Sequence, residues 1–185
     1  LVENLKIKYS NKNINFLSAF SLTIFSNEYK ALKNAVTQAP PTLNTHHLMN
    51  ISWLCDLINS TITKVEPLLA EGNHVVLDRY HLCATVYSMA TTNADISCLY
   101  RLYKTIPSPD CAIHLDIDVN TAYSRIAGRS KTKDYYETLN GLKRIQTTYE
   151  SAISNIDYPL YRINSGISLE HTLSQAQLII DPLIN

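Results

Sequence analysis

Glycine is scarce in this sequence, and its glycines lie far apart. The 185 residues contain four of them, Gly72, Gly128, Gly141 and Gly166. A loop that wraps phosphate in backbone amides, either the P-loop or the dinucleotide fingerprint, needs several glycines within about six residues. Neither kind of loop therefore occurs within these residues.

Net charge, clustered cysteine and long apolar runs are also absent. Sixteen basic residues balance sixteen acidic ones, so no overall field attracts nucleic acid or an anionic membrane. The four cysteines show no CxxC spacing, which favours reduced thiols over a disulfide framework or a metal site. No apolar run approaches the roughly 18 residues of a membrane-spanning helix, and no signal-peptide pattern opens the chain, so we expect a cytoplasmic protein.

The apolar pattern alternates between helices and short strands, which is typical of an α/β domain. Strands are expected at residues 14–17, 74–78, 111–116 and 160–163. Helices are expected at residues 1–12, 26–37, 45–71, 80–89, 94–104, 119–128, 135–155 and 168–180. No repeat or linker interrupts this order, so we expect residues 1–185 to form a single domain.

The longest expected helix begins at Thr45, a good N-cap, and ends at Gly72. Pro67 should bend its last turn. Apolar residues recur along this helix at helical spacing and predict one buried stripe. These residues are Leu48, Ile51, Leu54, Cys55, Ile58, Ile62, Val65 and Leu69.

Two charged residues lie at the carboxyl end of the expected buried strand 74–78. Ligands of open α/β sheets bind at the carboxyl ends of the strands, where Asp78 and Arg79 are expected. The Arg79 guanidinium can bind a phosphate through two hydrogen bonds, and the Asp78 carboxylate can hold Mg²⁺ or its bound water. The alternative is structural: Asp78 caps the next helix and Arg79 pairs with a surface carboxylate.

A basic run follows the strand that ends at Asp116. Four of its residues, Arg125, Arg129, Lys131 and Lys133, fall within nine positions. Phosphoryl transfer needs positive charge over the transferred group, and a mobile loop can deliver that charge while excluding water. Alone, the run is explained more simply by charges that complement the dipole of a helix on a solvated face.

The order and spacing of these segments resemble the thymidylate kinase family of P-loop nucleoside monophosphate kinases. Residues 67–80, ending in Asp-Arg-Tyr, are similar to its helix–strand–DRY segment, and Tyr87 follows at the family's distance. Residues 109–118 resemble its PD…LDVD strand, and residues 125–129 the start of its LID. Residues 157–165 and the helix after them resemble its last strand, adenine loop and terminal helix.

The resemblance implies a three-layer αβα fold with a parallel sheet, of the P-loop NTPase kind, with a LID at about residues 125–137. It implies ATP and Mg²⁺ as cofactors and a homodimer formed through the long helices. The implied reaction is phosphorylation of a nucleoside monophosphate, with dTMP as the first expected acceptor and dTDP as its product. No role for nucleic acid or membrane is implied.

Four acceptor-side residues receive roles from the resemblance. Arg79 would hold the acceptor phosphate, and Asp78 would lie beside Mg²⁺ and the transferred phosphoryl group. Trp53 would stack on the base, and Tyr87 would pack near the sugar and favour deoxyribose. On their own, Trp53 and Tyr87 are equally well explained as core residues of apolar helices.

Four donor-side residues also receive roles from the resemblance. Arg129 would stack on the donor adenine or reach its phosphates, with Arg125 behind it. Asn164 and Ser165 would border the adenine.

Three positions depart from the family pattern on the acceptor side. Leu57 stands where the family has an arginine that reads the thymine edge, and Ala84 and Ser88 replace an expected Ser and Gln. Loss of a base-reading arginine removes about 1–3 kcal/mol of discrimination unless another group replaces it. The largely apolar residues 18–23 also replace the family's acidic-Pro-Gly-Gly segment. The sequence therefore does not determine which base the acceptor nucleotide carries.

The family places a strand and the P-loop directly before the helix that residues 1–12 continue. We expect those elements before Leu1 in the natural protein, because the strand is the centre of the family's sheet. Without it, the strands ending at Leu17 and Asp78 would lack a hydrogen-bonding neighbour on one side, and each unpaired buried backbone group would cost about 1–3 kcal/mol.

Two other functions remain open. One is a non-catalytic relative that serves as a binding or scaffold subunit, which the missing P-loop and the altered acceptor side both favour. The other is a deoxynucleoside kinase, which would phosphorylate a free 5′-hydroxyl and need a carboxylate base.

Overall fold

The computed structural model describes residues 1–19, 31, 34, 43–92, 101–129, 133–134 and 136–184. Its strands are β1 (Ile14–Ser18), β2 (His74–Asp78), β3 (Ala112–Asp116) and β4 (Leu160–Asn164). All four lie within one residue of the predicted bounds. The predicted helix 26–37, apart from residues 31 and 34, and residues 94–100 of another lie outside the described residues.

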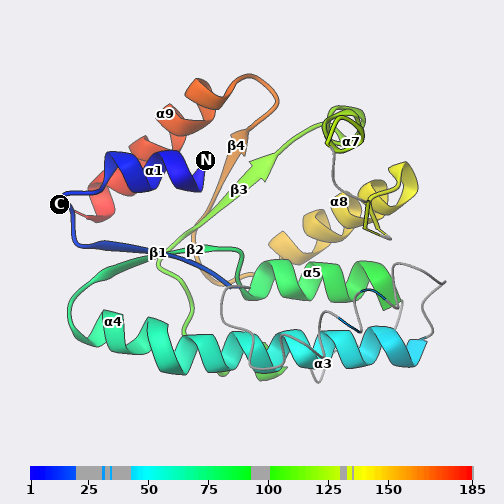
Figure 1. Ribbon diagram of the computed structural model, residues 1–185, viewed down its shortest axis with the longest axis horizontal. Coiled ribbons are helices and arrows are strands. Elements are labelled where there is room, and N and C mark those ends of the chain that lie inside the picture. Colours follow the sequence, from blue (N-terminus) through cyan, green and yellow to red (C-terminus); the bar gives the residue numbers. More distant parts are fainter. Residues whose placement is uncertain are drawn as a thin grey trace.

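The strands form two parallel pairs (Figure 1). β1 pairs with β2 from Ile14 opposite His74 to Ser18 opposite Asp78. β3 pairs with β4 from Ala112 opposite Leu160 to Asp116 opposite Asn164. The carboxyl ends of the two strands in each pair therefore meet at the same level.

The strand ladder agrees with the expectation that a neighbour is lacking on one side of β1 and β2. These two strands hydrogen-bond to each other along their whole length. Within the described parts of the chain, no ladder joins the pair β1–β2 to the pair β3–β4. Among the described residues, each strand therefore has one partner.

Seven α-helices are described. Their bounds are α1 Val2–Lys8, α3 Leu43–Ser60, α4 Glu66–Ala70, α5 His81–Thr92, α7 Val119–Ala127, α8 Leu139–Ile153 and α9 Leu169–Ile180. Three begin at side-chain caps that accept a backbone N–H of the first turn: Asp118 for α7, Thr138 for α8 and Ser168 for α9. The cap at Thr138 explains why α8 begins later than the predicted residue 135.

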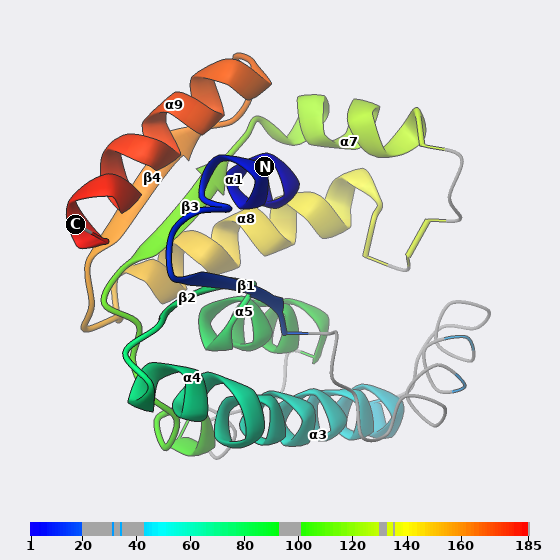
Figure 2. The ribbon, with the colours of Figure 1, turned by 60° about the vertical axis from the view of Figure 1, so that its left-hand side comes forward.

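The predicted helix 45–71 is present as one rod, α3 followed by α4 (Figure 2). A π-helical turn at Thr61–Val65 joins the two, directly before Pro67 in the first turn of α4. Pro67 has no backbone N–H to donate to a helical hydrogen bond. The π-helical turn, which is wider than an α-helical one, changes the backbone hydrogen-bond pattern close to this proline. Gly72 ends the rod with a positive φ of 78°.

The single buried stripe predicted for this rod is wrong. Leu54 and Val65 are buried, but Leu48, Ile51 and Ile62 are 51%, 48% and 55% exposed, and Leu69 is 44% exposed. The rod therefore has two neighbouring apolar faces, one covered by the domain and one open.

Helices cover both faces of the strands. Ile163 of β4 and Ile113 of β3 pack in one cluster with Leu5 of α1 and Ala176 of α9. On the opposite face, the ring of His114 lies 4.8 Å from that of Tyr149 on α8. This alternation along β3 gives a layered α/β fold, as predicted.

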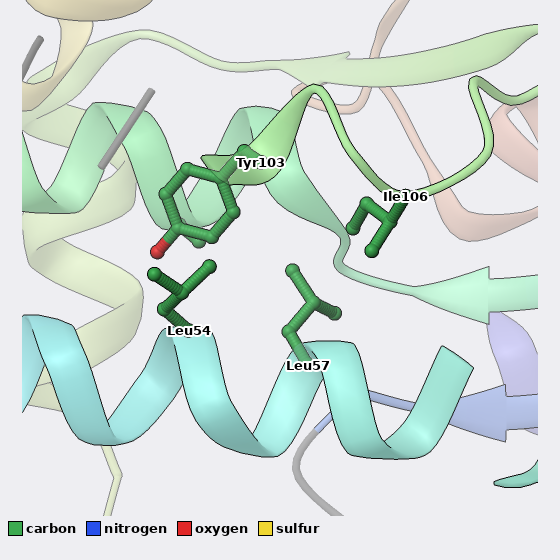
Figure 3. Packing of buried hydrophobic residues seen from close by; sticks show 5 residues of the cluster. Leu54, Leu57, Tyr103 and Ile106 are labelled. Atoms are coloured by element: carbon green, nitrogen blue, oxygen red, sulfur yellow. The ribbon is translucent and has the colours of Figure 1, made fainter. Parts of the chain in front are cut away.

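A second cluster joins the rod to the rest of the domain. It contains Leu54, Leu57, Ala84, Tyr103 and Ile106 (Figure 3). The cluster holds α3 against α5 and therefore fixes the two helices that flank the carboxyl end of β2.

Candidate functional site

A cavity lies between α3 and α5 at the carboxyl end of β2. Its lining includes Trp53, Asp56 and Leu57 of α3 and Arg79, Cys83 and Ala84 on the other side. The parallel pairing places Ser18 and Asp78 together at this end of β1–β2. The cavity therefore lies where ligands bind in open α/β sheets.

Arg79 has an unusual backbone. Among the described residues, it is the one non-glycine residue with a positive φ, 70°. The left-handed conformation costs an L-residue about 1–2 kcal/mol. Such strain persists only where the surrounding structure imposes it, and it clusters at functional sites. Here it turns the chain from β2 into α5.

The Arg79 side chain lies against an aromatic ring. Its guanidinium carbon is 5.8 Å from the centroid of Tyr87, within the range of a cation–π interaction. Burial acts to lower the pKa of Arg79, but the ionisable groups around it, Cys83 foremost, raise that pKa above its usual value. The guanidinium therefore keeps its charge.

Trp53 and Tyr87 face each other across the α3–α5 contact. Their ring centroids are 6.2 Å apart, and the planes are inclined by 46°. Burial raises the pKa of Tyr87 to about 12, so its hydroxyl stays protonated at neutral pH. The structure brings Trp53, Tyr87 and Arg79 together, although their binding roles stay predictions.

Asp78 is exposed at the end of β2, and the N–H of Ala19 donates to its backbone oxygen at 3.2 Å. Mg²⁺ takes oxygen ligands and commonly keeps water, needing only one or two carboxylates besides substrate phosphates. The exposed carboxylate of Asp78, next to Ser18, fits this requirement. The described residues contain no cluster of three His, Cys, Asp or Glu side chains that could hold a metal ion unaided.

The three residues that depart from the family pattern are buried. Leu57 and Ala84 are 4% and 7% exposed and belong to the same apolar cluster as Tyr103 (Figure 3), while Ser88 has no exposed surface. Leu57 also lines the cavity. Ala84 lines it as well, so this part of the cavity wall is apolar.

A second group of predicted residues meets at the carboxyl end of β3–β4. Arg125 Nη1 donates to the backbone oxygen of Ser165 at 3.1 Å. The N–H and hydroxyl of Ser165 both donate to the backbone oxygen of Asp116, at 2.8 and 2.9 Å, and Gly166 N donates to Asn164 Oδ1 at 2.9 Å. Arg125, Asn164 and Ser165 are thus close together.

Arg129 does not join that group. Its Nη2 pairs with Glu137 Oε1 at 2.6 Å, and the other Glu137 oxygen accepts from the N–H of Asp134 at 2.8 Å. Arg129 is therefore tied to the far end of the segment predicted as a LID.

Sequence reasoning missed Tyr136. Its ring meets that of Tyr87 edge-on, at 5.1 Å and 83°. The available signal was an aromatic residue in a polar stretch just before the N-cap Thr138. Nothing in that stretch indicated contact with a helix more than forty residues earlier.

Searching the described parts of the chain for a membrane-spanning helix finds none of sufficient length and apolarity.

Comparison with known proteins gives a family match. A family model described as thymidylate kinase matches residues 30–175. A thymidylate kinase from Xanthomonas oryzae pv. oryzae is 29% identical over 119 residues, which are 64% of this chain and 50% of the relative. One from Leptospira borgpetersenii is 28% identical over 99 residues, 53% of this chain and 48% of the relative. The chain therefore spans about half the length of these curated relatives.

Proposed function

The chain belongs to the thymidylate kinase family, whose fold is that of the P-loop NTPases, and we propose that it acts as a nucleoside monophosphate kinase. In this proposal a phosphate oxygen of dTMP attacks the γ-phosphorus of ATP, the bond from that phosphorus to the β,γ-bridging oxygen breaks, and dTDP and ADP leave. The observation that carries the proposal concerns Arg79, which directly follows β2. Its backbone is strained there, and its charged guanidinium lies against the Tyr87 ring.

On the acceptor side, Arg79 binds the monophosphate through its paired N–H groups. The base stacks on Trp53, and Tyr87 packs against the sugar. Because Arg79 is already ordered by Tyr87, less side-chain entropy is lost when the phosphate binds. Catalysis by such a site rests on orientation and on charge placed in advance.

On the donor side, the proposal assigns Asn164 and Ser165 to the adenine and Arg125 and Arg129 to the phosphates. Mg²⁺, when bound, neutralises phosphate charge, and Asp78 would hold the ion or one of its waters. The proposal keeps the cytoplasmic location expected from the sequence.

The proposal also includes a homodimer. It is supported by the open apolar face of the rod 43–70, which is formed by Leu48, Ile51, Cys55, Ile62 and Leu69. A second copy would remove this face from water.

Product analysis tests the function. The protein as its gene encodes it is incubated with ATP, Mg²⁺ and either dTMP, dUMP, dCMP or thymidine, and the products are separated by chromatography. We expect dTDP from dTMP and no dTMP from thymidine. Phosphorylation of thymidine would indicate a deoxynucleoside kinase. Tight binding of dTMP without any dTDP would indicate the non-catalytic relative, which the lack of a glycine-rich loop in these residues favours.

A further inference from the structure

The ring of Tyr87 is held on two sides. Trp53 approaches from α3 at 6.2 Å, and Tyr136 approaches edge-on at 5.1 Å from the segment before α8. The Arg79 guanidinium carbon lies 5.8 Å from the centroid of the same ring. The position of the Arg79 head group therefore depends on a ring that Tyr136 helps to fix.

Tyr136 is itself anchored. Its hydroxyl donates to Asp134 Oδ2 at 3.2 Å, and the Asp134 N–H donates to Glu137 Oε2 at 2.8 Å. Glu137, with a side chain only 13% exposed, also pairs with Arg129. These contacts hold the Tyr136 ring in one place.

The Tyr136 backbone approaches the first turn of α8 at Gly141, where the residue has no Cβ. A Cβ at Gly141 would overlap the Tyr136 carbonyl oxygen. Gly141 also donates its N–H to the N-cap Thr138 at 3.0 Å. A glycine inside a helix costs about 0.5–1 kcal/mol relative to alanine. Gly141 therefore lowers the stability of α8 at the point where the Tyr136 backbone approaches it.

We propose that Tyr136 is a positioning residue for the acceptor phosphate: it fixes the Tyr87 ring and, through that ring, the Arg79 guanidinium. This inference rests on the proposed function, because it assumes that Arg79 binds a nucleoside monophosphate. Because Arg79 meets only the phosphate, the effect of Tyr136 is largest for ligands that carry the phosphate. Binding of the nucleoside alone depends on Tyr136 only through the sugar contact proposed for Tyr87, which is a smaller effect.

Fluorescence of Trp53, the one tryptophan among these residues, reports binding in the cavity. The natural protein and its Tyr136→Leu and Tyr136→Phe variants are titrated with dTMP and with thymidine. Tyr136→Leu raises the Kd for dTMP about 5–10-fold, of the order of one cation–π contact, and leaves the Kd for thymidine within about 2-fold. Tyr136→Phe keeps the ring and stays within about 2-fold for both ligands. Tyr161→Leu, at an exposed tyrosine of β4, is the matched control and changes neither Kd.

A double-mutant cycle tests whether the effect passes through Arg79. In an Arg79→Gln background, Tyr136→Leu changes the Kd for dTMP less than about 2-fold, because the group that it positions is gone. Circular dichroism of each variant verifies that the fold is kept.

Two results overturn the inference while leaving the function intact. One is an equal loss of dTMP and thymidine affinity in Tyr136→Leu, which would make the residue a general support of the pocket. The other is unchanged dTMP affinity in that variant. A natural protein with no saturable response to dTMP would instead remove the proposed function, and the inference with it.

Discussion

The guanidinium carbon of Arg79 lies 5.8 Å from the centroid of the Tyr87 ring, although Arg79 directly follows a strand and Tyr87 lies within α5. The contact exists because the chain turns sharply at Arg79, with a φ of 70°. The strained backbone at Arg79 and the contact with Tyr87 therefore place the positive charge of Arg79 at the carboxyl end of β2.

The strain at Arg79 predicts an order of stability between two variants. Arg79→Gly and Arg79→Ala both lose the side chain, but only alanine places a Cβ in the left-handed conformation. We expect the free energy of unfolding of the glycine variant to exceed that of the alanine variant by about 1 kcal/mol. Urea denaturation measures this difference, and an alanine variant of equal stability would show that the left-handed turn is absent.

Gly141 predicts a steric effect. Alanine favours a helix by about 1 kcal/mol over glycine, yet a Cβ here would overlap the Tyr136 carbonyl. We expect Gly141→Ala to lower the free energy of unfolding by about 1–2 kcal/mol, because the turn must shift. Asn140→Ala, at the exposed neighbouring position, is the control and should be neutral or stabilising in thermal melts. Stabilisation by both changes would contradict the close approach.

Two histidines predict how stability depends on pH. Burial lowers the pKa of both His81 and His114 below the usual 6.5, and the nearby carboxylates of Asp157 and Asp116 oppose this only in part. Below about pH 6.5 the unfolded chain therefore binds more protons than the folded one, and the free energy of unfolding falls as the pH drops towards the lowered folded values.

Urea unfolding at pH 7.5 and pH 5.5 measures this loss. The double variant His81→Gln and His114→Gln should show a smaller difference between the two pH values than the natural protein. An unchanged difference would mean that other groups titrate in this range.

The open apolar face of the rod predicts the oligomeric state. Ile62 is 55% exposed at its middle, and Ile62→Glu would bury one charge from each copy at the contact, which is costly. We expect the natural protein to have twice the monomer mass by light scattering and this variant to be monomeric. Ile7→Glu, at a 75% exposed residue of α1, should stay dimeric. A natural protein of monomer mass would contradict the dimer.

The strands were predictable from the sequence because each is a short apolar run bounded by turn residues. The predicted end of β2 located Asp78 and Arg79 at the carboxyl end of that strand. The apolar spacing located Trp53 and Tyr87 on the helices that flank it. The exposure of Ile51 and Ile62 was not predictable, since periodicity marks an apolar face without saying what covers it.

Other features depend on tertiary contacts alone. The left-handed turn at Arg79 has no local signal, because arginine is not a residue that favours it. The contact of Tyr136 with Tyr87 joins segments far apart in the sequence. In the segment predicted as a LID, Arg129 pairs with Glu137 while Arg125 binds the backbone of Ser165. Single-sequence patterns carry none of this information.

Above all, we propose that Arg79 receives the phosphate of an acceptor nucleotide beside Trp53. The most direct test is a titration of Trp53 fluorescence with dTMP in the natural protein and in Arg79→Gln. We predict a saturable change whose Kd rises at least about 10-fold in the variant, the loss expected for a charge-assisted hydrogen bond, while the Kd for thymidine is the same in both proteins. A dTMP affinity unaffected by Arg79→Gln, or no saturable change at all, would contradict the account.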